Sequence, residues 1–101
     1  MKLMTKAIEK KIPNLYGQSG KDARVYAKFF TPWTHWTWYA TEYDPNDELF
    51  FGLVKGIAEE LGYWRLSDLT DVSGPAGLKI ERDRYWSDET TLNQVMNGEK
   101  S

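Results

Sequence analysis

The chain contains no cysteine and a single histidine, His35. The absence of thiols excludes disulfide bonds, thiolate nucleophiles, zinc fingers and iron–sulfur ligation. One histidine leaves metal binding only to sites built from carboxylates. The sequence also has no phosphate loop and no evident nucleophile–base pair. We therefore predict no catalytic residue, no metal and no cofactor.

Long apolar runs are missing as well. No segment approaches the roughly 20 apolar residues that a membrane-spanning helix needs. The start, Met1 to Lys6, carries positive charge but no apolar run long enough for a signal peptide. We therefore expect a cytoplasmic protein without a membrane segment. The formal net charge of -2 gives no overall attraction to nucleic-acid phosphates or anionic lipid, although a local patch can still bind either.

Aromatic side chains, in contrast, are abundant. The chain has five Trp, six Tyr and four Phe, and nine of these lie between Phe29 and Phe51. A chain of 101 residues has the usual size of one domain. We therefore predict a single domain, residues 1–101, with an aromatic-rich core.

The N-terminal part predicts a short helix and then an aromatic meander over residues 24–55. Apolar residues at near-helical spacing predict the helix over residues 1–12, which Pro13 ends. Its lysines suit a solvated helix face better than a nucleic-acid arm, because Glu9 interrupts them and residues 1–12 contain no arginine. Alternating apolar and polar residues predict three strands, at 24–30, 36–43 and 48–55.

The C-terminal part predicts one more strand and two helices within residues 62–97. We expect a turn of helix over 56–62 closed by Gly62, and then a short fourth strand over 63–66. The remaining expected elements are a short helix capped by Ser67, an extended segment over 79–86, and a last helix starting at Ser87 or Asp88. The predicted fold class is α+β. It combines a small antiparallel meander sheet of three to five strands with short helices at the N-terminus, after the fourth strand and at the C-terminus.

The aromatic residues of the second strand divide between two faces by parity. Trp36, Trp38 and Ala40 share one face, while Thr37, Tyr39, Thr41 and Tyr43 share the other. We interpret the tryptophan face, with Phe51, as core. The tyrosine face, extended by Tyr26, Phe30 and Phe50, is either a stacking platform for single-stranded nucleic acid or a surface covered by core or partner.

Three polar groups are candidates for chemistry. The imidazole of His35 is the only side chain with an unperturbed pKa near neutrality, but a position in a turn or at a strand edge explains this residue more simply. The acidic residues Glu42 to Glu48 offer oxygen ligands, but the turn Asp44-Pro45-Asn46-Asp47 accounts for them and no metal is predicted. The run Glu81-Arg82-Asp83-Arg84 presents two arginines able to bind carboxylate or phosphate, or forms cross-strand ion pairs on a solvated face.

The predicted binding surface combines the open aromatic positions with the exposed polar ones. Its residues are Trp33, His35, Tyr39, Tyr43, Glu81, Arg82 and Asp83. Aromatic and arginine side chains are the types enriched at recognition surfaces.

Seven short motifs occur in a characteristic order. They are Ile12–Tyr16 (IPNLY), Lys28–Pro32 (KFFTP), Trp36–Tyr39 (WTWY) with Glu42, Phe51–Val54 (FGLV), Glu60–Tyr63 (ELGY), Leu66–Leu69 (LSDL) and Ile80–Asp83 (IERD). By these motifs, from about Ile12 to Leu92, the chain resembles the bacterial family catalogued as domain of unknown function 2958. The resemblance implies a small stand-alone protein of bacteria, plasmids or phages, and brings no established activity or catalytic residue. The Trp33-Thr34-His35 turn and the basic segment before Ile12 fall outside the pattern.

These observations favour a small cytoplasmic binding or accessory protein of bacterial or mobile-element origin, which acts by protein contacts rather than as an enzyme. Its expected partner is another protein or a second copy of itself. Two alternatives stay open. One is a single-stranded nucleic-acid binder that uses Tyr39 and Tyr43, and the other is an enzyme with carboxylates at Glu42 and Glu81.

Overall fold

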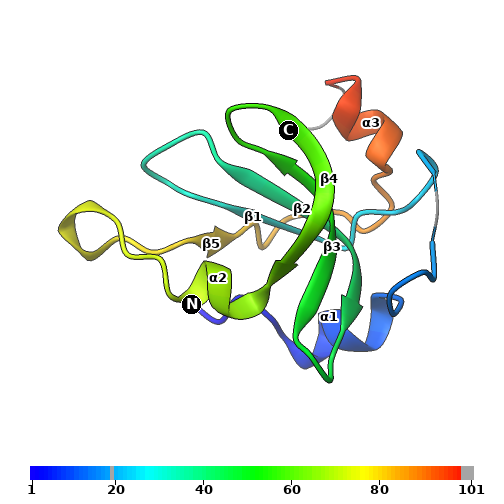
Figure 1. Cartoon of the computed structure of the whole chain (residues 1–101), viewed down its shortest axis with the longest axis horizontal. Coiled ribbons are helices and arrows are strands. Elements are labelled where there is room, and N and C mark those ends of the chain that lie inside the picture. Colours follow the sequence, from blue (N-terminus) through cyan, green and yellow to red (C-terminus); the bar gives the residue numbers. More distant parts are fainter. Residues whose placement is uncertain (19, 99–101) are drawn as a thin grey trace.

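A computed structural model describes residues 1–18 and 20–98, and Ser19 and residues 99–101 lie outside the described residues. The fold is built on a five-stranded antiparallel sheet in the order β4-β3-β2-β1-β5 (Figure 1). The strands are β1 (Ala27–Phe30), β2 (Thr37–Asp44), β3 (Leu49–Lys55), β4 (Glu59–Arg65) and β5 (Glu81–Arg82). The helices are α1 (Lys6–Lys11), α2 (Leu66–Thr70), α3 (Leu92–Met96) and the single 3-10 turn η1 (Pro75–Gly77). The predicted α+β class and the places of its short helices are confirmed.

Each face of the sheet carries a hydrophobic cluster, and the helices divide between them. α1, α2 and the N-terminal segment cover what we call the first face, whereas α3 lies against the second face (Figure 1). The first cluster contains Leu3, Met4, Ile12, Ala27, Phe29, Ala40, Tyr43, Phe50, Trp64, Leu69 and Ile80. The second is smaller and contains Ala23, Val25, Tyr39, Leu53, Leu92 and Val95.

Phe50 is the centre of the aromatic packing on the first face. Its fully buried ring lies 4.5 Å from the ring of Tyr43, and 5.4 Å from those of Phe29 and Trp64, measured between centroids. Such aromatic pairs contribute about 0.5–1.5 kcal/mol each beyond the burial of their area. Four strands, β1 to β4, therefore meet at one side chain.

A β-bulge in β2 inverts the alternation that the sequence predicted. The pairing of β2 with β3 shifts between Ala40 and Glu42, which leaves Thr41 as the extra residue. After a bulge, each side chain of the strand lies on the face opposite to the one that simple alternation predicts. Tyr43 therefore joins Ala40 on the first face, and the prediction that Tyr43 shares a face with Tyr39 is wrong.

The face assignment of β3 is also corrected. Phe50 lies in the first cluster, while its neighbour Phe51 points to the second face, where it contacts Tyr63 at 4.9 Å between ring centroids. Parity within one strand cannot place two strands relative to each other, because the register comes from their pairing. The observed register sets Tyr39 opposite Leu53, which puts Phe51 on the side of Tyr39.

Several element boundaries differ from those predicted. Residues 59–62 belong to β4 rather than to a helical turn, because Glu59 pairs with Lys55 across a β3–β4 hairpin. The last helix begins after Thr91, whose side chain accepts a hydrogen bond from the backbone N–H of Gln94. The Gln94 side chain in turn accepts from the N–H of Thr91, so a capping box decided that start.

The first and last strands are shorter than predicted. β1 starts at Ala27, and Arg24 makes only an isolated bridge to Thr91. β5 covers two residues of the extended segment predicted over 79–86. The chain leaves the β1 edge after Asp83, whose N–H still donates to the carbonyl of Lys28 at 2.9 Å.

Gly52 and Gly62 are paired directly across β3 and β4, yet their surroundings differ. A Cβ on Gly52 would lie 1.9 Å from the backbone oxygen of Tyr39, while a Cβ on Gly62 would have no atom within 4 Å. We predict that Gly52→Ala lowers the free energy of unfolding by at least about 2 kcal/mol, because the β2 backbone must move. The matched Gly62→Ala variant should change it by no more than about 0.5 kcal/mol. Urea unfolding of both variants measures the difference, and equal stabilities would contradict it.

Candidate functional site

The sheet has two edges of very different length. β5, at one edge, pairs with β1 through only two residues, whereas β4 forms the other edge over seven residues. An unpaired strand edge presents a row of backbone donors and acceptors that can pair with another chain. β4 is therefore the edge with enough length to bind a further strand.

The hydrogen bonds that flank β4 show which of its residues point outward. The N–H of Gly56 donates to the carbonyl of Ala58, and that of Leu66 donates to the carbonyl of Glu48. The residue pairs Gly56–Ala58 and Glu48–Leu66 continue the register of the β3–β4 ladder without a break. In an antiparallel ladder, every second residue pair is hydrogen-bonded. The backbone groups of Glu60, Gly62 and Trp64 thus face β3. Those of Glu59, Leu61, Tyr63 and Arg65 face outward.

One outward donor is already used. The N–H of Arg65 donates to the Asp68 carboxylate at 2.9 Å, which closes the start of α2. The open part of the edge therefore runs from Glu59 to Tyr63.

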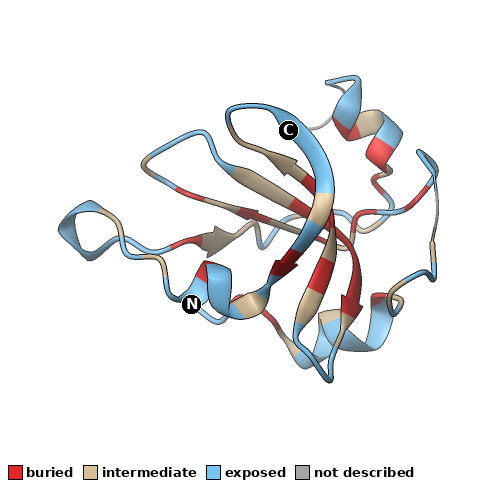
Figure 2. Cartoon of the chain, in the orientation of Figure 1, coloured by how far each residue is buried: buried red, intermediate tan, exposed pale blue. Residues whose placement is uncertain are grey.

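Large apolar side chains stand beside this open edge. Leu61 and Tyr63 are 53% and 52% exposed, and both project on the second face of the sheet. Figure 2 shows the early part of the β4 ribbon in the colour of exposed residues, whereas β2 and β3 carry the colours of buried and intermediate ones. A strand with half-exposed leucine and tyrosine side chains at its free edge favours contact with another polypeptide.

A hollow of about 400 Å³ lies on the second face next to these side chains, and we call it the β4 hollow. It is lined by Tyr16, Gln18, Gly20, Lys21, Ala23, Thr41, Glu42, Phe51, Leu61, Tyr63, Leu92 and Met96. Most of this lining is apolar, with a few polar groups among it, as is usual for binding pockets.

Glu42 fixes one rim of the β4 hollow. Its side chain is 4% exposed, and its two carboxylate oxygens accept hydrogen bonds from the N–H groups of Tyr16 and Gln18, at 2.9 and 2.8 Å. The Gln18 amide then donates to the carbonyls of Thr41 and Arg24. The carboxylate predicted as a candidate for catalysis is thus committed to holding a loop.

Tyr16 stands on that rim with an unusual backbone conformation. Its φ is 67°, a left-handed value that costs energy for a residue with a side chain, and its side chain is 85% exposed. A hydrogen bond between the Tyr63 and Tyr16 side chains is the main cause that raises the pKa of the Tyr63 hydroxyl. The two tyrosines therefore meet across the mouth of the hollow, although they are 47 residues apart in a chain of 101.

A second, more polar hollow of about 370 Å³ lies on the same face near the 31–36 turn. Its lining includes the predicted site residues His35 and Tyr39, together with Lys28 and Lys55. The two ammonium groups lie 5.9 and 5.6 Å from the centroid of the Tyr39 ring. Burial lowers the pKa of Lys28, the charge of Lys55 lowers it further, and Asp83 opposes both.

The Tyr39 ring itself is not available at the surface. Tyr39 is 2% exposed and Tyr43 is 4% exposed, and they lie on opposite faces of the sheet. Burial raises the pKa of both hydroxyls above the ordinary value. These two tyrosines do not form the open stacking platform considered from the sequence.

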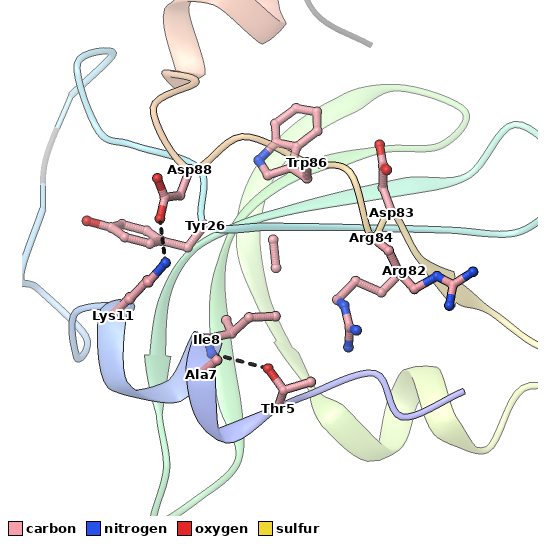
Figure 3. Close-up of a pocket in the computed structure, with 11 residues that line it drawn as sticks. Thr5, Ala7, Ile8, Lys11, Tyr26, Arg82, Asp83, Arg84, Trp86 and Asp88 are labelled. Carbon is pink, nitrogen blue, oxygen red and sulfur yellow. Dashed lines mark hydrogen bonds and ion pairs between the residues drawn. The ribbon is translucent and has the colours of Figure 1, made fainter.

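A third hollow of about 230 Å³ lies between α1 and the segment that follows β5 (Figure 3). The predicted site residues Arg82 and Asp83 line it, and Asp88 forms ion pairs with Lys11 at 3.5 Å and with Arg24 at 3.1 Å. Arg82 also donates to the carbonyls of Lys2 and Leu3. This arginine therefore holds the N-terminal segment in place.

Of the remaining predicted site residues, Glu81 lies with Arg82 and Asp83 at a further hollow of about 400 Å³, whereas Trp33 lies apart from them. Trp33 packs against the first cluster and against Gly74, where a Cβ would come within 2.5 Å of its ring. Glu81 of β5 pairs with Phe30 of β1, and Phe30 pairs in turn with Thr37 of β2. Glu42 lies on β2 as well, five residues beyond Thr37. That separation is about 16 Å along the strand, so the two carboxylates Glu42 and Glu81 do not share one site.

Metal and membrane features can be stated for the described residues. Across residues 1–18 and 20–98, no group of three or more His, Asp or Glu side chains is placed to hold a metal ion. In the same part of the chain, no helix has the length and apolar character needed to cross a bilayer.

Sequence reasoning missed the β4 edge. Only the second half of this strand carries a clear signal, the aromatic Tyr63 and Trp64, whereas Glu and Gly, as in its first half, are depleted in strands. The first half instead predicts a helical turn, since Ala58-Glu59-Glu60-Leu61 are good helix formers ahead of a glycine.

Glu42→Gln tests the anchoring of the rim. Glutamine keeps the size of the side chain but replaces one accepting oxygen with an NH₂ group, so one backbone N–H loses its partner. We predict a loss of about 1–3 kcal/mol in the free energy of unfolding, with faster amide exchange at Tyr16 and Gln18. The exposed Glu60→Gln should leave both quantities unchanged within error. Unaltered exchange in Glu42→Gln would show that the carboxylate does not hold this loop.

The comparisons with known proteins give one match. No curated protein and no solved structure matches the chain. The sequence model of the family described as "Protein of unknown function (DUF2958)" matches residues 2–99, which is nearly the whole chain. The match includes the basic segment before Ile12, which the motifs alone had left outside. The resemblance seen in the sequence is confirmed, and the chain belongs to this family.

Proposed function

We propose that this protein acts by binding an extended polypeptide at the free edge of β4, with side chains of that polypeptide entering the β4 hollow. The observation that carries this proposal is the combination of two features at the β4 edge. The outward backbone groups of Glu59, Leu61 and Tyr63 have no hydrogen-bond partner among the described residues, and two apolar side chains beside them are half exposed. Strand addition of this kind takes affinity from main-chain hydrogen bonds and specificity from pockets for alternate side chains.

The hollow supplies the second requirement. Phe51, Leu61 and Tyr63 project on the second face, which is the face that the hollow occupies. Alternate side chains of an added strand would project on the same face. The expected ligand is therefore a segment with apolar residues at every second position.

The polar hollow near His35 supports a nucleic-acid function less well. Lys28 and Lys55 are set against charges of opposite sign, since Asp83 acts on Lys28 and the Glu59 carboxylate lies 3.4 Å from the Lys55 amine. The tyrosines that would stack bases are buried. Protein contact is consequently the function that we propose, and oligonucleotide binding is an outcome of the test.

Selection of a displayed random peptide library on the folded protein tests the proposal. We expect the selected peptides to carry apolar residues at alternate positions, and their affinity can be measured by fluorescence anisotropy. The double variant Leu61→Glu/Tyr63→Glu should weaken binding by at least about tenfold, because it sets charges at the edge and over the hollow. A labelled oligothymidylate provides the nucleic-acid arm of the measurement.

Tyr85→Glu is the matched control, because Tyr85 is 92% exposed on the segment after β5, away from β4. It should leave peptide affinity unchanged. Peptides that bind both variants equally well, or salt-sensitive binding of the oligonucleotide alone, would overturn the proposed function.

A further inference from the structure

We propose that the strand which adds to the β4 edge is β4 of a second copy of this chain, antiparallel and centred on Gly62. This inference rests on the proposed function and names its partner. The two copies would form one continuous ten-stranded sheet through their long edges.

Backbone geometry permits this register. Pairing about Gly62 sets Leu61 opposite Tyr63 of the second copy, and Glu59 opposite its Arg65. All four residues have outward-facing backbone groups, so they fall at hydrogen-bonded positions of the new ladder. The two Leu61–Tyr63 pairs would each exchange two N–H···O bonds. Glu59 would donate to the Arg65 carbonyl, since the Arg65 N–H is held by Asp68.

The charges select the same register. β4 carries Glu59 at its start and Arg65 at its end, and both side chains are exposed on the second face. Antiparallel pairing about Gly62 places each glutamate directly across from an arginine, a position at which opposite charges stabilise a sheet and like charges destabilise it. The strand is therefore complementary to itself in charge.

Neighbouring registers lose this match. A centre at Leu61 would set Glu59 opposite Tyr63 and Arg65 opposite Ile57. A centre at Glu60 would place two Glu60 residues against each other. Only the register about Gly62 pairs both charges and sets the apolar Leu61 against Tyr63.

The apolar side chains would also gain from the contact. Leu61 and Tyr63 are each about half exposed, and side chains that lie directly opposite on one face of an antiparallel pair contact each other. Gly62 would lie on the two-fold axis, and it brings no side chain that the second copy would have to accommodate. Two-fold pairing uses the same patch on both copies, which is the commonest symmetry of protein dimers.

The interface is small, so the association should be weak. A ladder of seven residues with two apolar pairs lies at the low end of specific interfaces, for which we expect dissociation constants of roughly 1–100 μM. Sedimentation velocity from low micromolar to near millimolar concentration covers this range.

A charge exchange tests the register. Glu59→Lys sets lysine against arginine, and Arg65→Glu sets glutamate against glutamate, so each single variant should dimerise at least about tenfold more weakly. The double variant Glu59→Lys/Arg65→Glu restores opposite pairs and the net charge of -2, and it should recover dimerisation. Circular dichroism confirms that each variant is folded.

Amide exchange gives an independent readout. The amides of Leu61 and Tyr63 should become protected as concentration rises, whereas those of Gly62 and Trp64, which bond β3, should be protected throughout. A chain that stays monomeric at near-millimolar concentration, or a double variant that fails to recover, would overturn the inference. If that monomer still binds selected peptides through Leu61 and Tyr63, the proposed function stands and only the second-copy partner is wrong.

Discussion

The bulge at Thr41 decides which side chains of β2 enter each of the two hydrophobic clusters. It lets one strand place Tyr39 in the second cluster and Tyr43 in the first. Without the extra residue, Tyr43 would leave the ring of Phe50 and Glu42 would enter the apolar first face. The bulge residue is itself secured, because the buried Thr41 hydroxyl donates to the carbonyl of Phe51.

The bulge also connects the core to the candidate site. It directs the Glu42 carboxylate towards the loop at Tyr16 and Gln18, and that loop forms one rim of the β4 hollow. A buried carboxylate without partners would cost several kcal/mol, so the two backbone N–H groups and the carboxylate depend on each other. The bulge in β2 thereby shapes the β4 hollow, which extends across β3 to the side chains of β4.

Much of the fold could be predicted, because its signals are local. Pro13 ends α1, the turn around Asp44 and Asn46 separates β2 from β3, and the helix after the fourth strand follows from its short amphipathic pattern. The site was predicted less well. Of the seven predicted residues, His35 and Tyr39 meet at one hollow and Arg82 and Asp83 at another, while Trp33 and Tyr43 pack in or against the first cluster.

The fold class and the aromatic core could be predicted from composition and from the alternation of residues along each strand, and the family from its short motifs. Which tyrosines are buried, what Glu42 binds and which sheet edge stays open became clear only from the packing of the folded chain. The physical reason is that a bulge and a strand register depend on pairing between distant residues, as of Ala40 with Gly52 and of Lys55 with Glu59. One residue of slip in either pairing would send every following side chain to the opposite face.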